Sequence, residues 1–205
     1  SHTDHSPLSR QLKAETGARI IGFGSADEAR TTFMKKLSSS LDLGGEEGID
    51  KDLLLDEKVY EKQILKLNNY SIEVVHTPGH LSNHICFSLK ERQILFSGDH
   101  VMGWATTLIS PPDGDLGSFM NSLEKLSIRE EVIYYPGHGK PLKEPRKMVL
   151  AQIKHRRDRE RQILNSVSKI SRTPAEIVDD VYVGLNPMLK AAAIRNVLAH
   201  LIDLY

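Results

Sequence analysis

Six histidine and aspartate side chains of this sequence are of the kinds that bind divalent metal ions. Three lie within its first five residues and three follow at wide spacing: His2, Asp4, His5, His80, Asp99 and His138. Neutral imidazoles and carboxylates bind catalytic Zn²⁺ at about 2.0–2.2 Å and leave a position open for water. A bound ion lowers the pKa of that water from about 15.7 to about 7. The set therefore predicts hydrolysis by a metal-bound hydroxide, with Asp99 bridging two ions roughly 3.5–4 Å apart.

A glycine directly precedes each of the three ligands that lie far along the chain. The motifs are Thr77-Pro78-Gly79-His80, Gly98-Asp99 and Pro136-Gly137-His138. Glycine permits a sharp turn, and proline stiffens two of these turns through its fixed φ angle. Each motif alone is more often an ordinary turn. Because all of them follow strand-like runs, together they favour a preorganised metal site.

Several residues near these motifs are expected to have supporting roles. His76 and His84 flank the Thr-Pro-Gly-His turn, and we expect them to support the ligands or the fold rather than bind metal. His100 follows a ligand directly, so in an extended backbone it points elsewhere. Cys86 lies in an apolar run and is expected to be buried. Trp104 either lines the substrate mouth or covers the core, and both alternatives stay open.

The elements that must position the ligands are predicted to be short strands alternating with helices. Residues 6–17 predict a helix, because serine followed by proline opens helices and glycine closes them. Residues 18–23 are typical of a buried strand, and Ser25 begins a capping box for a helix over residues 25–36. Residues 38–50 are rich in serine, glycine and acids, which indicates a surface loop.

Antiparallel strands are predicted further along the chain. Residues 63–67 and 70–75 form one predicted hairpin, and residues 85–89 and 93–96 form another. A predicted amphipathic helix and a last strand follow, over residues 116–126 and 132–135. This order of strands with interleaved helices favours an α/β fold built in layers.

After Pro145 the strand signals end and the pattern becomes helical. A long charged helix is predicted over residues 146–170, a capping box begins at Thr173, and a last helix begins at Asn186-Pro187. Three such helices resemble a helix-turn-helix or winged-helix arrangement. We therefore expect a boundary near residue 146, which separates a domain of residues 1–146 from a helical domain of residues 147–205.

The last helix permits two interpretations. A nucleic acid would contact its polar residues, which are Lys190, Arg195, Asn196 and His200. Alternatively, the helix belongs to a packing domain that shapes the substrate cleft, with those residues on a solvated face. Its apolar stripe would then face inward: Leu189, Ala193, Val197 and Leu201. The 27 basic and 27 acidic residues balance to zero formal net charge, which favours the packing domain.

Composition narrows the remaining possibilities. The 205 residues suffice for one large domain with a small appendage. No uncharged stretch approaches the roughly 20 apolar residues that span a bilayer, so we expect no membrane partner. The single cysteine, Cys86, allows no internal disulfide and agrees with a cytoplasmic location.

The combined motifs resemble those of the metallo-β-lactamase-fold hydrolases, and within them the glyoxalase-II-like and lactamase-beta-like protein 2 group. The family signature appears here as His2-x-Asp4-His5, Thr77 to His80, Gly98-Asp99 and Pro136 to His138. Similarity continues through residues 96–126 and 155–200, so the resemblance covers nearly the whole chain. It implies a four-layer αββα sandwich followed by a winged-helix-like domain.

The resemblance also implies a role for each ligand. His2 and His80 would bind a first ion, Asp4, His5 and His138 a second, and Asp99 both. Asp4 would in addition be catalytic, because it would orient the hydroxide or carry a proton. The ions implied are divalent, with Zn²⁺ foremost and Mn²⁺ or iron as alternatives, since mixed histidine and aspartate ligands suit all three.

The chain departs from the family pattern at its beginning. The first histidine of the signature would lie immediately before Ser1, and the strands of a leading β-rich segment are missing. We expect this sequence to be part of a longer protein with histidine at the preceding position.

Three functions are consistent with these features. The first is hydrolysis of a thioester, lactone or similar small carbonyl compound, and the second is cleavage of single-stranded RNA or another phosphodiester. The third is a non-catalytic scaffold with a degenerate metal site, which the six ligand residues disfavour. The fold alone does not choose a substrate, and a homodimer is an open alternative.

Overall fold

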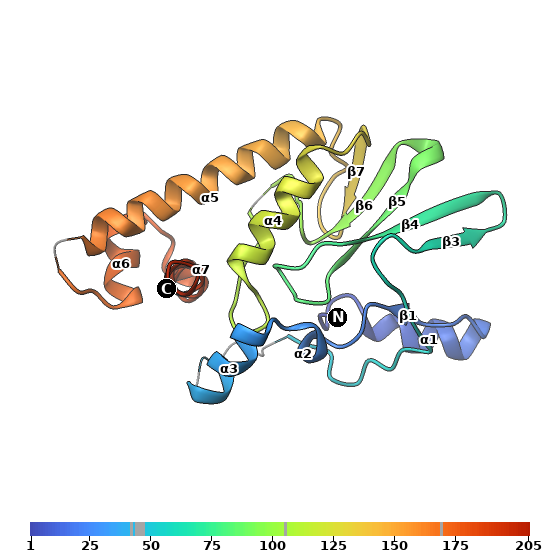
Figure 1. Ribbon diagram of the computed structural model, residues 1–205, viewed down its shortest axis with the longest axis horizontal. Coiled ribbons are helices and arrows are strands. Elements are labelled where there is room, and N and C mark those ends of the chain that lie inside the picture. Colours follow the sequence, from blue (N-terminus) through green and yellow to red (C-terminus); the bar gives the residue numbers. More distant parts are fainter. Residues whose placement is uncertain (42, 44–47, 105, 169) are drawn as a thin grey trace.

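A five-stranded sheet has the strand order β3-β4-β5-β6-β7 and lies at the opposite end of the molecule from α6 and α7 (Figure 1). The computed structural model describes residues 1–41, 43, 48–104, 106–168 and 170–205. The strands are β3 (Ile64–Leu67), β4 (Tyr70–His76), β5 (Ile85–Leu89), β6 (Ile94–Gly98) and β7 (Ile133–Pro136). Neighbouring strands are antiparallel, except that β6 and β7 are parallel. Both predicted hairpins and the predicted last strand are therefore confirmed.

Helices cover one face of this sheet (Figure 1). They are α4 (Leu116–Ser127), whose N-terminus is capped by the Asp115 carboxylate, and the first half of α5 (Pro145–Val167). Because side chains alternate along a strand, every second residue of β5, β6 and β7 points at these helices. The resulting core includes Val75, Cys86, Leu95, Leu116, Phe119, Leu123, Leu126, Tyr134, Val149 and Ile153.

The opposite face of the sheet is apolar and less covered. Phe96 and Tyr135 are 44% and 37% exposed, and their rings stack with centroids 5.7 Å apart. A second, parallel sheet of β1 (Ile21–Gly22) and β2 (Glu57–Lys58) lies across a cleft from this face. Two sheets and flanking helices confirm the predicted α/β class.

The N-terminal helices differ in part from the prediction. Helix α1 (Pro7–Thr16) ends at Gly17, whose φ of 71° is left-handed, as the helix-closing glycine predicts. The capping box at Ser25 is present, but α2 (Ala26–Ala29) lasts one turn, and α3 (Thr32–Ser40) begins at a new cap. The expected single helix is therefore two.

The break between these helices lies at Arg30, whose side chain forms an ion pair. Arg30 leaves the helical conformation with a ψ of 142°, and its guanidinium lies 2.6 Å from the Asp113 carboxylate. The strand expected over residues 18–23 is reduced to Ile21–Gly22. Helix α3 takes up the start of the expected loop over residues 38–50, of which residues 42 and 44–47 lie outside the described residues.

The C-terminal region is helical, as predicted. It contains α6 (Pro174–Val181), a 3₁₀ turn η2 (Pro187–Leu189) and α7 (Lys190–Asp203), and the capping box at Thr173 is confirmed. A second core joins these helices to the end of α5, with Ile163, Ile177, Val178, Ala193 and Val197 buried. Because α5 contributes Val149 to the first core and Ile163 to the second, one helix passes through both.

Two expectations for the last helix are wrong. Leu189 is 54% exposed rather than buried, because it belongs to the turn η2 that precedes α7. Asn196 and His200 are not on a solvated face: Asn196 is half-buried and His200 is 1% exposed. Helix α7 packs against α4 and α5 through the side that carries them. Among the described residues, no helix has the length and apolar character needed to cross a membrane.

Candidate metal centre

The sheet topology explains how ligands from distant parts of the sequence meet. Strands β4, β6 and β7 run in the same direction, so their C-terminal ends lie at one edge of the sheet. His80, Asp99 and His138 follow these three ends. The remaining ligands precede α1, where the backbone of Thr3 bonds that of Gly48 at 2.8 Å.

His2, His80 and Asp99 form a first group of ligands. Nδ1 of His2 lies 3.2 Å from Nε2 of His80, and that Nε2 lies 3.7 Å from Oδ2 of Asp99. The donor atoms all lie within 4.8 Å of one another, a spacing that one ion between them would span. His2 and His80 were assigned to one ion by the resemblance, and the structure brings them together.

Asp4, His5 and His138 form a second group. Nε2 of His138 lies 3.1 Å from Oδ2 of Asp4 and 3.1 Å from Nε2 of His5. The Asp4 carboxylate lies 3.5 Å from Nε2 of His5. All six residues expected from the sequence therefore fall into two adjacent groups.

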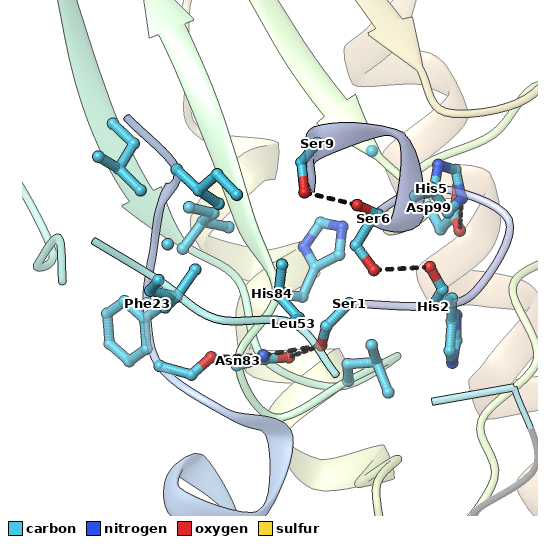
Figure 2. Close-up of a pocket in the computed structure, with 18 of the residues that line it drawn as sticks. Ser1, His2, His5, Ser6, Ser9, Phe23, Leu53, Asn83, His84 and Asp99 are labelled. Carbon is cyan, nitrogen blue, oxygen red and sulfur yellow. Dashed lines mark hydrogen bonds and ion pairs between the residues drawn. The ribbon is translucent and has the colours of Figure 1, made fainter. Parts of the chain in front are cut away.

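Asp99 contacts both groups. Its Oδ2 lies 2.9 Å from Nε2 of His5, and its Oδ1 lies 3.7 Å from Nε2 of His138. Oδ1 is buried and has no hydrogen-bond partner among the described residues. A buried carboxylate oxygen without a partner is costly, and a cation would satisfy it. The donor set and this oxygen fit two divalent ions that share Asp99. Figure 2 shows Asp99 and His5 together at one end of a cleft of about 300 Å³.

Hydrogen bonding and burial prepare the imidazoles for metal. Nδ1 of His80 donates to the Leu108 carbonyl at 2.9 Å, which leaves Nε2 with a free lone pair. Burial lowers the pKa of His80. Burial, followed by the nearby charge of His80, lowers the pKa of His2 to about 4. Both rings are therefore neutral at pH 7, which metal binding requires.

The Asp4 carboxylate is held in its ionised form. Burial alone would raise its pKa, but a hydrogen bond from its own backbone amide and the charges of His5 and His138 lower the pKa. Its side chain is 56% exposed, so it faces both the metal centre and solvent. The ionised carboxylate is the form that binds a cation.

Two of the glycines are required by close approach. A Cβ at Gly79 would collide with the backbone of Phe119 on α4, and the φ of this glycine is 143°. A Cβ at Gly137 would collide with Oδ1 of Asp99 and lie 3.0 Å from Cε1 of His5. The glycine before each histidine therefore lets the ligand turn pack tightly.

The neighbouring histidines lie outside both ligand groups. Nε2 of His76 bonds the Ser82 carbonyl at 2.9 Å, and Nδ1 of His84 bonds the Thr77 hydroxyl at 2.8 Å. His100 is fully buried, with its ring centroid 4.5 Å from that of Phe119. These histidines support the turns that carry the ligands.

Cys86 and Trp104 have clear positions. Cys86 is fully buried, and burial raises its pKa to about 12, so it is unreactive. Trp104 is 70% exposed, and its Cδ1 lies 2.9 Å from where a Cβ on Gly139 would be. Its exposure argues against the core alternative, and it lies beside the turn that carries His138.

A second cleft, of about 680 Å³, connects the first ligand group with α7. His2 and His80 lie at one end of it, and its walls include Leu81, Leu108, Ala191, Ala192 and Ile194. Sequence reasoning placed α7 near the substrate cleft but assigned none of these residues. No local motif marks them, because the cleft arises where the helical region packs on the loop before α4.

Comparisons with known proteins agree with this geometry. Residues 1–138 match the model of the metallo-beta-lactamase superfamily, and residues 173–205 match the beta-lactamase associated winged helix domain. The structure is similar to that of a metallo-beta-lactamase family protein from Thermus thermophilus. The TM-score is 0.76 at 22% identity, over 98% of this chain and 70% of that chain, which shows the shared fold.

Two curated relatives are similar in sequence. The atrochrysone carboxyl ACP thioesterase of Aspergillus fumigatus is 32% identical over 123 residues, which are 60% of this chain and 38% of that protein. The lactamase-like protein nscB of Arthroderma gypseum is 34% identical over 111 residues, which are 54% of this chain and 34% of that protein. The chain spans less than half the length of these relatives. With the family match over most of its length, the chain belongs to the metallo-beta-lactamase superfamily.

Proposed function

We propose that this protein hydrolyses acyl thioesters at a centre of two divalent ions, with Zn²⁺ foremost. The observation that carries the proposal is the position of Asp99 between two ligand groups, with one buried carboxylate oxygen unsatisfied. The thioester substrate is supported by the relative that is named a thioesterase. When bound, the ions would lower the pKa of a shared water and polarise the substrate carbonyl oxygen.

The residues of the chain have distinct parts in this reaction. His2 and His80 would hold one ion, Asp4, His5 and His138 would hold the other, and Asp99 would contribute to both. Asp4 belongs to the second group, is ionised and is exposed to solvent, so it accepts a proton from the attacking water. The new C–O bond forms as the C–S bond breaks, and that proton passes to the leaving thiolate. The products are a carboxylic acid and a thiol.

The 680 Å³ cleft would receive the acyl group. Leu108, Ile194 and the two small residues Ala191 and Ala192 give it largely apolar walls that end at His80. An apolar chain placed there would present its carbonyl carbon to the first ligand group. We therefore propose acyl groups of aliphatic or aromatic character as substrates.

A substrate panel on the full-length protein tests the proposal. The metal content is first measured, and acyl-pantetheine thioesters, matched oxygen esters, lactones and single-stranded RNA are then compared. Thioester turnover that is lost in His80→Ala and Asp99→Ala supports the proposal. Cleavage of RNA without thioester turnover would establish the phosphodiester alternative. Absence of bound metal, with no activity after Zn²⁺ or Mn²⁺ is added, would establish the scaffold.

The acyl cleft has its own test. Ala191→Phe would fill the cleft, so turnover of long acyl thioesters falls while that of acetyl thioesters is retained. Ala151→Phe places the same side chain at an exposed position of α5 that does not line this cleft. Equal effects of the two variants on long and short substrates would contradict the assignment of the cleft.

A further inference from the structure

A short segment, residues 107–109, joins the metal centre to the helical region. The Leu108 carbonyl accepts the hydrogen bond that orients His80, at 2.9 Å. The Thr107 hydroxyl donates to the backbone carbonyl of Asp99. The segment therefore contacts a ligand of the first group and the ligand that both groups share.

The helical region holds the same segment from its other side. Arg156 on α5 donates from Nη2 to the Thr107 carbonyl. Asn196 on α7 accepts from the Ile109 amide at 3.2 Å and from Nη1 of Arg156 at 3.2 Å. The peptide groups before and after Leu108 are thus both fixed, which leaves the Leu108 carbonyl a single direction in which to point.

Arg156 is placed unusually for a charged side chain. It is 4% exposed, and its guanidinium lies 5.3 Å from the centroid of the Phe119 ring. Among the described residues, its hydrogen-bond acceptors are a backbone carbonyl and an amide oxygen, and neither is a carboxylate. Burying a cation is costly, and the planar guanidinium suits two acceptors held at a fixed angle. A lysine has its three donors on one nitrogen and lacks this fork.

The Phe119 contact gives Arg156 a second route to the metal centre. Phe119 packs so closely on Gly79 that a Cβ there would collide with it, and Gly79 directly precedes His80. The guanidinium thus contacts the segment that orients the His80 ring, and it also lies over Phe119, which packs on the turn that carries His80.

We propose that Arg156 and Asn196 are positioning residues of the metal centre, acting through residues 107–109 on the ring of His80 and the backbone of Asp99. The inference rests on the proposed metal centre and not on the choice of a thioester as substrate. Partners that orient ligands tune metal affinity even though they never contact the ion.

Helix α5 also supplies a matched control. Arg159 lies one turn further on, donates to the Val181 carbonyl at 3.0 Å and lies 3.7 Å from the centroid of the Tyr182 ring. Like Arg156 it donates to a backbone carbonyl and lies over an aromatic ring, but these contacts join α5 to the end of α6. A role in packing alone predicts the same behaviour for both arginines, whereas positioning predicts a difference.

Titration of the metal-free full-length protein with Co²⁺ alone distinguishes these roles. The readouts are the Co²⁺ dissociation constant and the visible absorption spectrum. Arg156→Lys and Asn196→Ala should weaken binding by about 10–100-fold and alter the spectrum. Arg159→Lys should leave both unchanged. Asn196→Asp should bind Co²⁺ as the wild type does, because a carboxylate oxygen accepts both hydrogen bonds.

Other results would overturn the inference. Unchanged Co²⁺ binding and spectra in Arg156→Lys and Asn196→Ala, with only a lower unfolding temperature, would reduce both residues to packing. If Arg156→Lys fails to fold, Asn196→Ala decides, because α5 is then intact. Wild-type protein that binds no Co²⁺ would overturn the metal centre itself. Absence of thioester turnover would overturn only the proposed substrate.

Discussion

Oδ2 of Asp99 lies 2.9 Å from Nε2 of His5, although 94 positions separate the two residues in the sequence. One residue follows a central strand and the other precedes the first helix. Their contact joins the N-terminal segment to the sheet, so the metal centre is also a tertiary contact. Ligand substitutions are therefore expected to change both metal content and local packing.

Replacing the shared carboxylate should remove both ions. Loss of an outer partner lowers metal affinity by about 10–100-fold, so loss of a direct, bridging ligand in Asp99→Ala should exceed that range. Asp4→Asn removes a ligand of the second group only and should leave one ion bound. Metal analysis of the purified variants measures the difference. Equal metal content in the two variants would contradict the bridging role of Asp99.

Gly137→Ala should impair the second ligand group without unfolding the protein. The new methyl group would collide with Oδ1 of Asp99 and press on His5, and both would have to move. Gly17→Ala is the control, since the space around Gly17 is open and only its left-handed backbone is strained, by about 1–2 kcal/mol. The control should lose stability and keep its metal. A metal content unaffected by Gly137→Ala would show that the turn accommodates a methyl group without displacing Asp99 or His5.

His200 should make stability depend on pH. Burial, followed by the charges of Arg156 and Arg159, lowers its pKa to about 3 in the folded protein, against about 6.5 in the unfolded chain. Between these values the unfolded state binds more protons, so stability rises with pH. As the pH falls below 6.5, this histidine should lower the free energy of unfolding by up to about 1.4 kcal/mol per pH unit.

Urea unfolding of wild type and His200→Gln at pH 7.5 and pH 5.5 measures this contribution. Glutamine does not titrate, so the variant should lose less stability over this interval. Other titrating groups are common to both proteins and cancel in the comparison. Parallel losses would show that His200 becomes protonated without unfolding.

Asp113→Ala should destabilise the fold strongly. Its carboxylate lies 2.6 Å from the Arg30 guanidinium, and both side chains are buried. The substitution takes a buried carboxylate from the buried guanidinium, and the pair of Arg30 with the exposed Asp27 at 2.8 Å offsets part of the cost, so the loss should be about 3 kcal/mol. Asp158→Ala breaks exposed pairs with Lys154 and Arg161 and should change stability little. The free energy of unfolding of each variant is measured in urea. Similar losses in Asp113→Ala and Asp158→Ala would mean that water reaches the Arg30 guanidinium freely.

The sequence was most informative where structure is local. The capping boxes at Ser25 and Thr173 depend on residues within one turn, and both are present. The turns before His80 and His138 are likewise encoded by adjacent proline and glycine. Local chemistry of this kind is independent of what the rest of the chain does.

Features that depend on packing between distant segments were not predictable. Asn196 and His200 are polar residues on a helix, and their burial follows only from how α7 packs on α4 and α5. Arg156 lies in the long charged helix, where no local pattern distinguishes it from its neighbours, yet it is buried and donates to the Thr107 carbonyl. Likewise, no residue near Arg30 in the sequence predicts its ion pair with Asp113, which lies far along the chain.

Helix α5 has a consequence for dividing the chain. The first family match ends at residue 138 and the second begins at residue 173, which suggests separable modules. Yet the helix between them contributes Val149 and Ile153 to one core and Ile163 to the other. A cut anywhere along it would leave apolar side chains of one core or the other without their neighbours. Heat or urea should accordingly melt both regions in a single transition.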